Sequence, residues 1–155
     1  MFGARLIKMK KIICICFVLV SLASCNSAKQ AQKKMAMGNY EQAIDIAIRH
    51  LQRNQTRSNS QEQMLILQEA FSKLKVRDKK RIKFLNREKN DANIIEIYNT
   101  YQKLERIQNR ITPLLPLYHE GLSKNIEFDF TDYSTSILEA QDELVEFYYN
   151  EANLL

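Results

Sequence analysis

The scarcity of glycine and proline constrains the fold of this 155-residue chain more than any other feature, because it contains only three Gly and two Pro. β-Sandwiches and barrels need turn residues roughly every 8–12 positions, and nucleotide-binding folds need glycine-rich loops, so these classes are excluded. With 45% hydrophobic and 26% charged residues, the chain is neither disordered nor a multi-span membrane protein. The sequence therefore predicts an all-α fold, and its length allows a single domain.

The first 24 residues have the pattern of a secretory signal. Four basic residues with no acidic neighbour precede an unbroken apolar run, Ile12 to Val20, and mostly small residues follow it. A positive head, a short apolar core and small residues are the three regions of an export signal. The apolar stretch from Ile12 to Ala23 has 12 residues, whereas a transmembrane helix needs roughly 20. Translation could begin at Met1 or at Met9, and the sequence does not decide between them.

The export signal ends in a motif that resembles the bacterial lipobox, formed by Leu22, Ala23, Ser24 and Cys25. In that motif small residues let the chain enter the peptidase extended, cleavage falls before the cysteine, and its nucleophilic thiol carries diacylglycerol. The resemblance implies a lipoprotein signal peptide over 1–24, a covalent lipid on Cys25 and a short tether over 25–26. Asn26 is not the Asp that retains such proteins in the inner membrane of some bacteria, so the expected location is the outer membrane, facing the periplasm. The alternative is a soluble exported protein with a coincidental cysteine.

A break at Gly38 and Asn39 separates two predicted helices, over 27–37 and 40–53. So short a turn makes the two helices pack antiparallel. The turn resembles that of a tetratricopeptide (TPR) repeat, in which glycine makes the turn, an aromatic side chain fills the hairpin and a small residue lets the helices approach closely. The matching residues are Gly38, Asn39, Tyr40 and Ala43. This resemblance implies a TPR-like right-handed α-solenoid, although the upstream helix lacks the family's Leu-Gly pair.

Three more helices are predicted, over 60–88, 91–111 and 132–154, so that the whole helical domain covers 27–155. Because Asp78 interrupts its apolar face, the segment 60–88 is either one long helix or two. The irregular segment 112–131 holds both prolines and is rich in Leu, Tyr and Phe. It is expected to pack down on the helices, and the competing interpretation is a binding loop held outward. The last helix loosely resembles the closing part of a group of TPR-like lipoproteins of unknown role, through Asp132, Tyr133, Ser134, Ala140 and Tyr148.

The last predicted helix carries apolar residues on two faces. One stripe consists of Ile137, Ala140, Leu144 and Phe147, and the other of Leu138, Val145, Tyr149 and Ala152. A terminal helix of a solenoid normally shows a polar outer face to water. Either a partner covers the second stripe, or the coding sequence is truncated, or the 114–131 segment folds over it. The predicted partner-binding residues are Leu138, Val145 and Tyr149.

Catalytic and metal-binding motifs are absent from the sequence. His50 and His119 have no His or Cys partner at ligand spacing, and there is no glycine-rich phosphate loop and no nucleophile elbow. Cys14 and Cys16 leave with the signal and Cys25 carries the lipid, so no cysteine nucleophile remains. The sequence therefore predicts no enzyme activity, no metal, no small-molecule substrate and no cofactor beyond the lipid on Cys25.

Charge is distributed unevenly along the chain. Residues 73–89 contain nine Lys or Arg, whereas 125–155 contain eight acidic residues and no basic one. Export to the envelope excludes nucleic acid as the partner of the basic run. The charges form solvated faces, or basic and acidic segments lie together in the fold, or the basic face meets an acidic partner or anionic lipid.

The predicted function is that of a membrane-anchored lipoprotein whose helical repeats serve as a scaffold for another envelope protein. The alternative is an envelope factor that contacts anionic lipid or cell-wall polymer through the basic 73–89 face.

Overall fold

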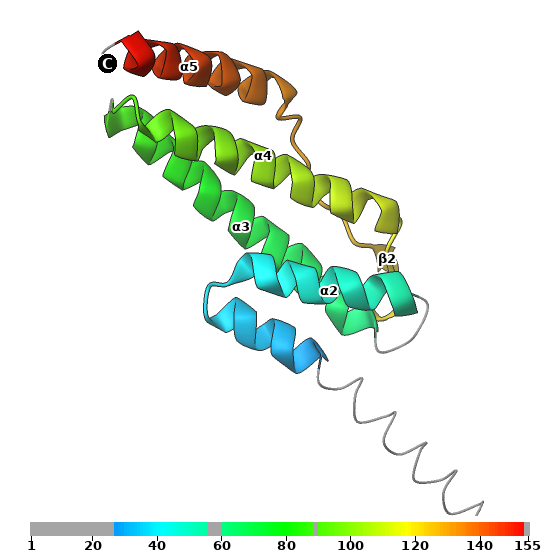
Figure 1. Ribbon diagram of the computed structural model, residues 1–155. Helices are drawn as coiled ribbons and strands as arrows, with labels where there is room; N and C mark the ends of the chain where they lie inside the picture. The colour runs from blue at the N-terminus through cyan, green and yellow to red at the C-terminus, as the bar shows by residue number, and fades with distance from the viewer. Residues whose placement is uncertain (1–26, 56–59, 89, 154–155) are drawn as a thin grey trace, which may run out of the picture.

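The computed structural model describes residues 27–55, 60–88 and 90–153. Apart from short turns, this part of the chain is helical except for one irregular segment, which contains a hairpin of two short strands (Figure 1). The predicted all-α class is therefore confirmed. None of the described helices is both long and apolar enough to cross a membrane. The predicted signal, the lipobox with Cys25, and Leu154 and Leu155 lie outside the described residues. The helices are residues 27–36, α2 (Tyr40–Asn54), α3 (Ser60–Glu88), α4 (Asn93–Ile111) and α5 (Ser134–Asn153).

The first helical hairpin is closed by Gly38, whose φ of +72° lies in the left-handed region that glycine adopts without strain. Its N–H donates to the Met35 carbonyl at 3.0 Å, and the N–H of Asn39 donates to the Lys34 carbonyl at 2.9 Å. These bonds satisfy carbonyls at the end of the first helix, which stops at residue 36 because Met37 enters the turn. On the other side, α2 buries the apolar residues that recur at three- and four-residue spacing: Ala43, Ile44, Ala47, Ile48 and Leu51.

The helix α3 is a single helix of 29 residues, so Asp78 does not interrupt it. At 1.5 Å per residue α3 is about 43 Å long. The Asp78 side chain is only 5% exposed, yet it sits between two cations. Arg77 Nε lies 2.8 Å from Oδ1 and Lys103 Nζ lies 2.6 Å from Oδ2, the latter as an ion pair rather than a well-aligned hydrogen bond. The carboxylate is tolerated in an apolar seam because charge partners compensate for its loss of water.

Residues 90–92 form a turn directly before α4. The side-chain oxygen Oδ1 of Asn90 accepts a hydrogen bond from the N–H of Ala92 at 3.1 Å. This local bond holds the chain in a turn up to Ala92. The helix α4 therefore begins at Asn93, two residues later than the sequence pattern predicts.

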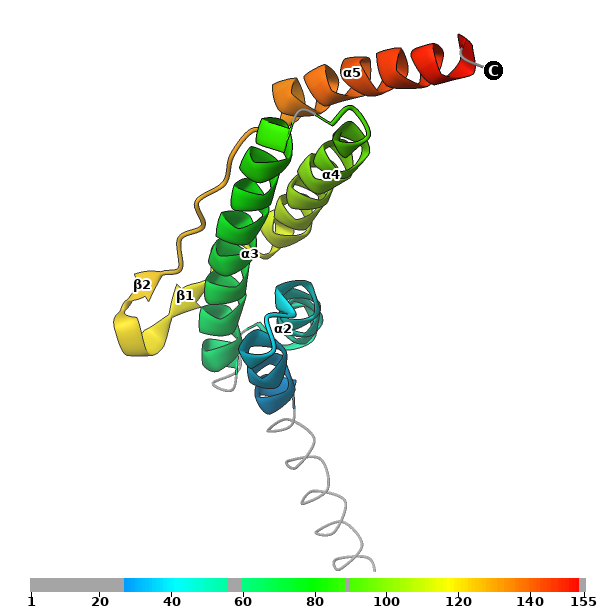
Figure 2. The ribbon, with the colours of Figure 1, turned by 90° about the vertical axis from the view of Figure 1, so that its left-hand side faces the viewer.

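Most of the irregular segment after α4 packs along the helices, whereas its hairpin over 118–125 projects outward and is exposed apart from His119 (Figure 2). It contains η1 (Thr112–Leu114), β1 (Tyr118–His119), η2 (Glu120–Leu122) and β2 (Lys124–Asn125), with β1 and β2 paired antiparallel. After β2 the chain runs extended along α3 towards α5 (Figure 2). Phe128 and Phe130 pack edge-on against Phe71 of α3, with ring centroids 6.0 and 5.6 Å away. Gln108 binds both the N–H and the carbonyl of Thr131 at 2.8 Å.

The buried apolar residues form two main clusters, one towards each end of the α3–α4 pair. The first joins α2, the N-terminal half of α3, the C-terminal half of α4 and the irregular segment. The second joins the C-terminal half of α3, the N-terminal half of α4 and α5. Along α3 the buried polar side chains of Lys75 and Asp78 lie between them. A polar layer therefore divides the core.

Candidate binding surface

The helix α5 begins at a turn made by Asp132. Its Oδ1 accepts hydrogen bonds from the N–H of Ser134 at 2.9 Å and from the Ser134 hydroxyl at 2.6 Å. Both bonds favour the ionised form, so the hydroxyl and then the backbone of Ser134 hold the pKa of Asp132 below its usual range. Because this turn occupies Asp132 and Tyr133, the helix starts at Ser134, two residues later than predicted.

The inner face of α5 packs on the N-terminal half of α4. Ala140 is buried in the cluster that contains Ile94 and Ile97, and half-buried Leu144 and Phe147 pack against the same cluster. A small residue at the centre of the contact lets the two helices approach closely. The first predicted apolar stripe is therefore the face that attaches α5 to the rest of the molecule.

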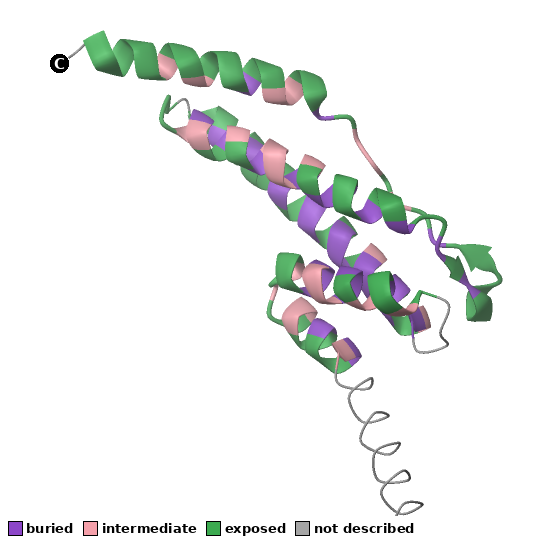
Figure 3. Cartoon of the chain, turned by 45° about the vertical axis from the view of Figure 1, so that its right-hand side comes forward, coloured by how far each residue is buried: buried purple, intermediate pink, exposed green. Residues whose placement is uncertain are grey.

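The opposite face of α5 is open to solvent. Leu138, Val145 and Tyr149 are 61%, 63% and 70% exposed, and in Figure 3 most of the helix is coloured as exposed. At 100° per residue these three side chains lie together, roughly opposite Ala140. We call them the outer stripe. The 112–131 segment runs beside α3 instead, so the expectation that it folds over this stripe is wrong.

Acidic residues border the outer stripe along one side. Exposed Glu139, Asp142, Glu143 and Glu146 occupy this edge of the helix. The edge also faces a cleft of about 930 Å³ between the second half of α5 and the turn before α4, where Asp91 and Phe147 contribute to the walls. Because the stripe is apolar with an acidic border, the chemically complementary ligand is an apolar segment that carries basic residues.

The basic run of α3 is divided between internal ion pairs and solvent. Arg81 Nε lies 2.6 Å from Glu96 Oε1, and this hydrogen bond raises the pKa of Arg81 and lowers that of Glu96. Lys75 is buried against Asp129, while Arg77 contacts Asp78. By contrast, Lys79, Lys80, Lys83 and Arg87 are exposed. Part of the basic run therefore pairs with acidic residues within the fold, and the other part is a solvated face.

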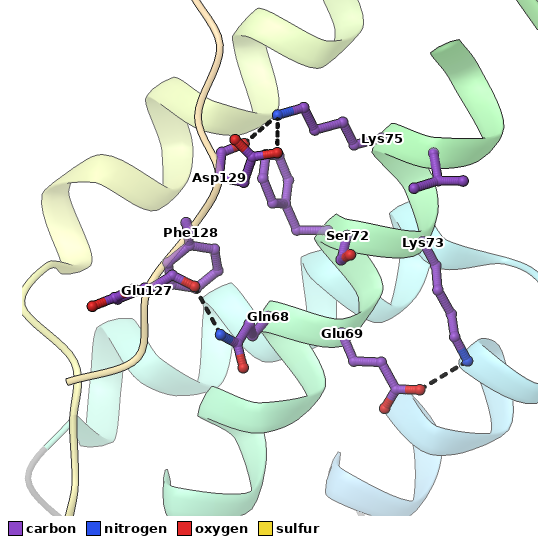
Figure 4. A pocket seen from close by; sticks show the side chains of 10 residues that line it. Gln68, Glu69, Ser72, Lys73, Lys75, Glu127, Phe128 and Asp129 are labelled. Carbon is purple, nitrogen blue, oxygen red and sulfur yellow. Dashed lines mark hydrogen bonds and ion pairs between the residues drawn. The ribbon is translucent and has the colours of Figure 1, made fainter. Parts of the chain in front are cut away.

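A groove of about 470 Å³ separates α3 from the extended chain at 127–129 (Figure 4). Lys75 Nζ reaches across it to Asp129 Oδ2 at 2.7 Å, and Gln68 donates to the Glu127 carbonyl at 2.8 Å. The hydrogen bond from Lys75 lowers the pKa of Asp129. A neighbouring strand would normally donate hydrogen bonds to the carbonyl groups of an extended segment, and here these side chains donate them instead. Their arrangement explains how the irregular segment is held on α3.

The two histidines take part in local hydrogen bonding. His50 Nδ1 lies 3.2 Å from the Ser27 hydroxyl, and its Nε2 lies 3.4 Å from that of Ser60. His119 Nδ1 accepts from the N–H of Leu122 at 3.1 Å. Within residues 27–55, 60–88 and 90–153, no three His, Cys, Asp or Glu side chains gather closely enough to hold a metal ion.

The predicted turn residues lie together at the end of the first hairpin, far along the chain from the outer stripe. The Tyr40 ring lies under the Arg77 guanidinium, 5.5 Å from its centroid, and Ala43 is fully buried. Arg77 Nη1 also reaches the Gly38 carbonyl at 3.4 Å. The turn is therefore joined to the middle of α3.

Sequence reasoning missed the buried charges and one exposed apolar pair. Asp78 lies on the apolar face of α3 between Leu74 and Ile82, and a carboxylate at such a position indicates a buried ion pair, here with Lys103. The exposure of Val76 and Phe84 on the basic face of α3 had no comparable signal, because it depends on which side of α3 its neighbours cover.

Comparison of the chain with protein-family models, curated proteins and solved structures finds no significant match.

Proposed function

We propose that this chain is an outer-membrane lipoprotein, facing the periplasm, whose helical domain is a scaffold that binds another protein through the outer stripe of α5. The observation that carries the proposal is the exposure of three aligned apolar side chains on a helix whose other face is already docked. Single exposed apolar residues are ordinary, but an aligned set on one face is typical of a recognition site. Tyrosine, which Tyr149 and neighbouring Tyr148 supply, is enriched where binding energy concentrates.

The first hairpin supports a TPR-like repeat as the unit of this scaffold. Gly38 makes the turn in the left-handed conformation, and the fully buried Ala43 packs in the core beside half-buried Tyr40. In a TPR-like solenoid successive hairpins stack so that each buries the face of the one before it. The α3–α4 pair would then be the second hairpin, and α5 would open a third.

The expected ligand is an amphipathic segment, most simply a helix, that lays apolar residues along the outer stripe. Basic residues on one side of that segment would meet Glu139, Asp142 and Glu146. The proposal is one of binding and assigns no catalytic step to the chain.

The position of Ser27, two residues after Cys25, favours this function over direct contact with lipid through the basic face. The Ser27 hydroxyl accepts from Gln63 Nε2 at 3.2 Å, so residue 27 lies beside the first turn of α3, whereas α5 lies at the other end (Figure 2). A lipid on Cys25 would hold that first turn close to the bilayer. From Gln63 to Lys83 the helix rises about 30 Å, several times the Debye length of about 8 Å. With α3 upright, Lys80 and Lys83 are out of reach of the headgroups, and α5 lies at the end of the molecule far from the anchor (Figure 2).

Substitution of Val145 by lysine tests the binding site. Because Val145 is exposed, the change should leave the circular dichroism spectrum and melting temperature unchanged, but it should abolish capture of the partner by the tagged chain from envelope extracts. Asn109→Lys adds the same charge at an exposed position on α4 and should capture the partner as the wild type does. Unfolding of Val145→Lys would instead place this residue in the core, and equal capture by both variants would remove α5 from the site.

Membrane fractionation tests the anchor and separates it from the basic face. The full chain should sediment with membranes, and Cys25→Ala should move it to the soluble fraction because no lipid can be attached. Lys80→Glu with Lys83→Glu should remain membrane-bound at both low and high salt. If the charge-reversed variant leaves the membrane while Cys25→Ala stays, the alternative function through the basic face replaces this one.

A further inference from the structure

Two exposed helix faces of this chain carry the same pattern with opposite charge. On α3, Val76 and Phe84 are 51% and 50% exposed, and exposed Lys80 lies midway between them. On α5, exposed Asp142 lies between Leu138 and Val145 of the outer stripe. One face is therefore apolar–basic–apolar and the other apolar–acidic–apolar.

The spacing of the two patterns matches as well as their chemistry. Val76 and Phe84 are eight residues apart, which is about 12 Å along a helix, and Leu138 and Val145 are seven apart, about 10.5 Å. The central charge falls four residues from one end in each case, so it meets its counterpart whether the two helices run parallel or antiparallel. Arg81 lies over one side of the Phe84 ring, with its guanidinium 5.4 Å from the centroid, and the ring remains half exposed.

We propose that the occupant of the outer stripe is the Val76–Lys80–Phe84 face of a second copy of this chain. This inference rests on the proposed function, since it names the partner of the same surface. Leu138 and Val145 would pack against the two apolar side chains, and the Asp142 carboxylate would meet the Lys80 ammonium. Both faces are exposed in the same molecule, so neither covers the other within one chain.

The charges disfavour the symmetric alternative, in which two outer stripes pair with each other. Between Asn125 and the C-terminus the chain has eight acidic residues and no basic one, so two α5 helices would place like charges side by side. The α3–α5 contact is heterologous, because it joins different faces of the two copies. It leaves one α3 face and one α5 face available at the ends, and copies would join head to tail.

Lipid anchoring would make a small contact of this kind effective. The helix α5 extends beyond the α3–α4 pair, where a second molecule can approach it (Figure 2). Anchored copies are confined to one membrane surface, which raises their effective concentration above that of free molecules. A single-helix contact needs this help, because stable interfaces bury about 800 Å² per partner.

Reciprocal charge reversal tests the proposal. We would compare the full chain in density-matched detergent with a basic-reversed variant, Lys80→Glu with Lys83→Glu, and an acid-reversed variant, Asp142→Lys with Glu146→Lys. Sedimentation velocity should show concentration-dependent association of the wild type, and about tenfold or more weaker association of each variant alone, because like charges then meet. An equimolar mixture should recover association, since each reversed face then finds an opposite charge in the other variant. Lys29→Glu with Lys124→Glu has the same net charge as the basic-reversed variant and should associate like the wild type.

The outcomes separate this inference from the function on which it rests. A wild type that stays monomeric, or a mixture that does not recover association while both variants remain folded, overturns the self-association. If Val145→Lys still abolishes capture of a different protein in that case, the scaffold function stands with another partner. If neither self-association nor Val145-dependent capture is seen, both are wrong.

Discussion

Replacing Lys103 by methionine is expected to lower the free energy of unfolding by about 3 kcal/mol, because it leaves the buried carboxylate of Asp78 short of a charge partner. Lys103 Nζ lies 2.6 Å from Oδ2 of a side chain that is 5% exposed. Arg77 stays at 2.8 Å from the other oxygen, but its guanidinium is half exposed and only one oxygen is compensated. Chemical denaturation followed by circular dichroism measures the loss.

Lys75, which pairs with an exposed carboxylate, provides the matched control. Lys75 is as buried as Asp78, but its partner Asp129 has a side chain that is 89% exposed. Lys75→Met leaves that carboxylate in water, so the cost should stay below about 1 kcal/mol. Asp78→Leu combined with Lys103→Met removes both charges and should recover most of the stability lost in Lys103→Met alone. Equal losses for the two single lysine variants would show that burial of the remaining carboxylate does not decide the cost.

Replacing Ala140 by arginine is expected to detach α5 while the opposite end of the molecule stays folded. Ala140 lies in the contact between α5 and the Ile94–Ile97 side of α4. The arginine side chain is too large for this contact, and its charge would be buried among apolar residues. The cost should exceed about 3 kcal/mol locally, more than the docking of a single helix can compensate. Hydrogen exchange should show loss of protection in α5 and in the second cluster, with protection of α2 retained.

The neighbouring residue supplies the control for this prediction. Gln141 is exposed, so Gln141→Arg should leave the exchange of α5 unchanged. Ala140→Arg should also prevent partner capture although Leu138, Val145 and Tyr149 are intact, because their alignment depends on the docked helix. Protection lost throughout the chain would mean that the two clusters fold as one unit.

The sequence predicts the local features of this fold well, since they depend on residues close together in the chain. The spacing of apolar residues in α2 identifies its buried face, and a lone glycine at position 38 identifies the turn. The start points of α4 and α5 are less predictable, because hydrogen bonds from Asn90 and Asp132 side chains each shift the first helical residue by two positions.

Contacts between distant segments could not be predicted from local pattern. Lys75 meets Asp129 and Gln108 meets Thr131 only because the extended segment returns along α3. From sequence, Lys75 was one of nine bases in a run and Asp129 one of eight acids, with no sign that this pair would lie together. The exposure of the outer stripe likewise required knowledge of which face of α5 is docked.

Because the Lys75–Asp78 layer divides the core, ligand binding changes the local stability of one end of the molecule and not that of the other. The helix α2 contributes to one cluster and α5 to the other, while α3 and α4 pass through both. Local opening of α5 then exposes only the second cluster, at a free energy below that of global unfolding. A ligand on the outer stripe raises the free energy of that opening by RT ln(1 + [L]/Kd) and leaves the opening of α2 unchanged. The docking helix is thus held in place by its own ligand, while the end beside Ser27 keeps its stability whether or not a ligand is bound.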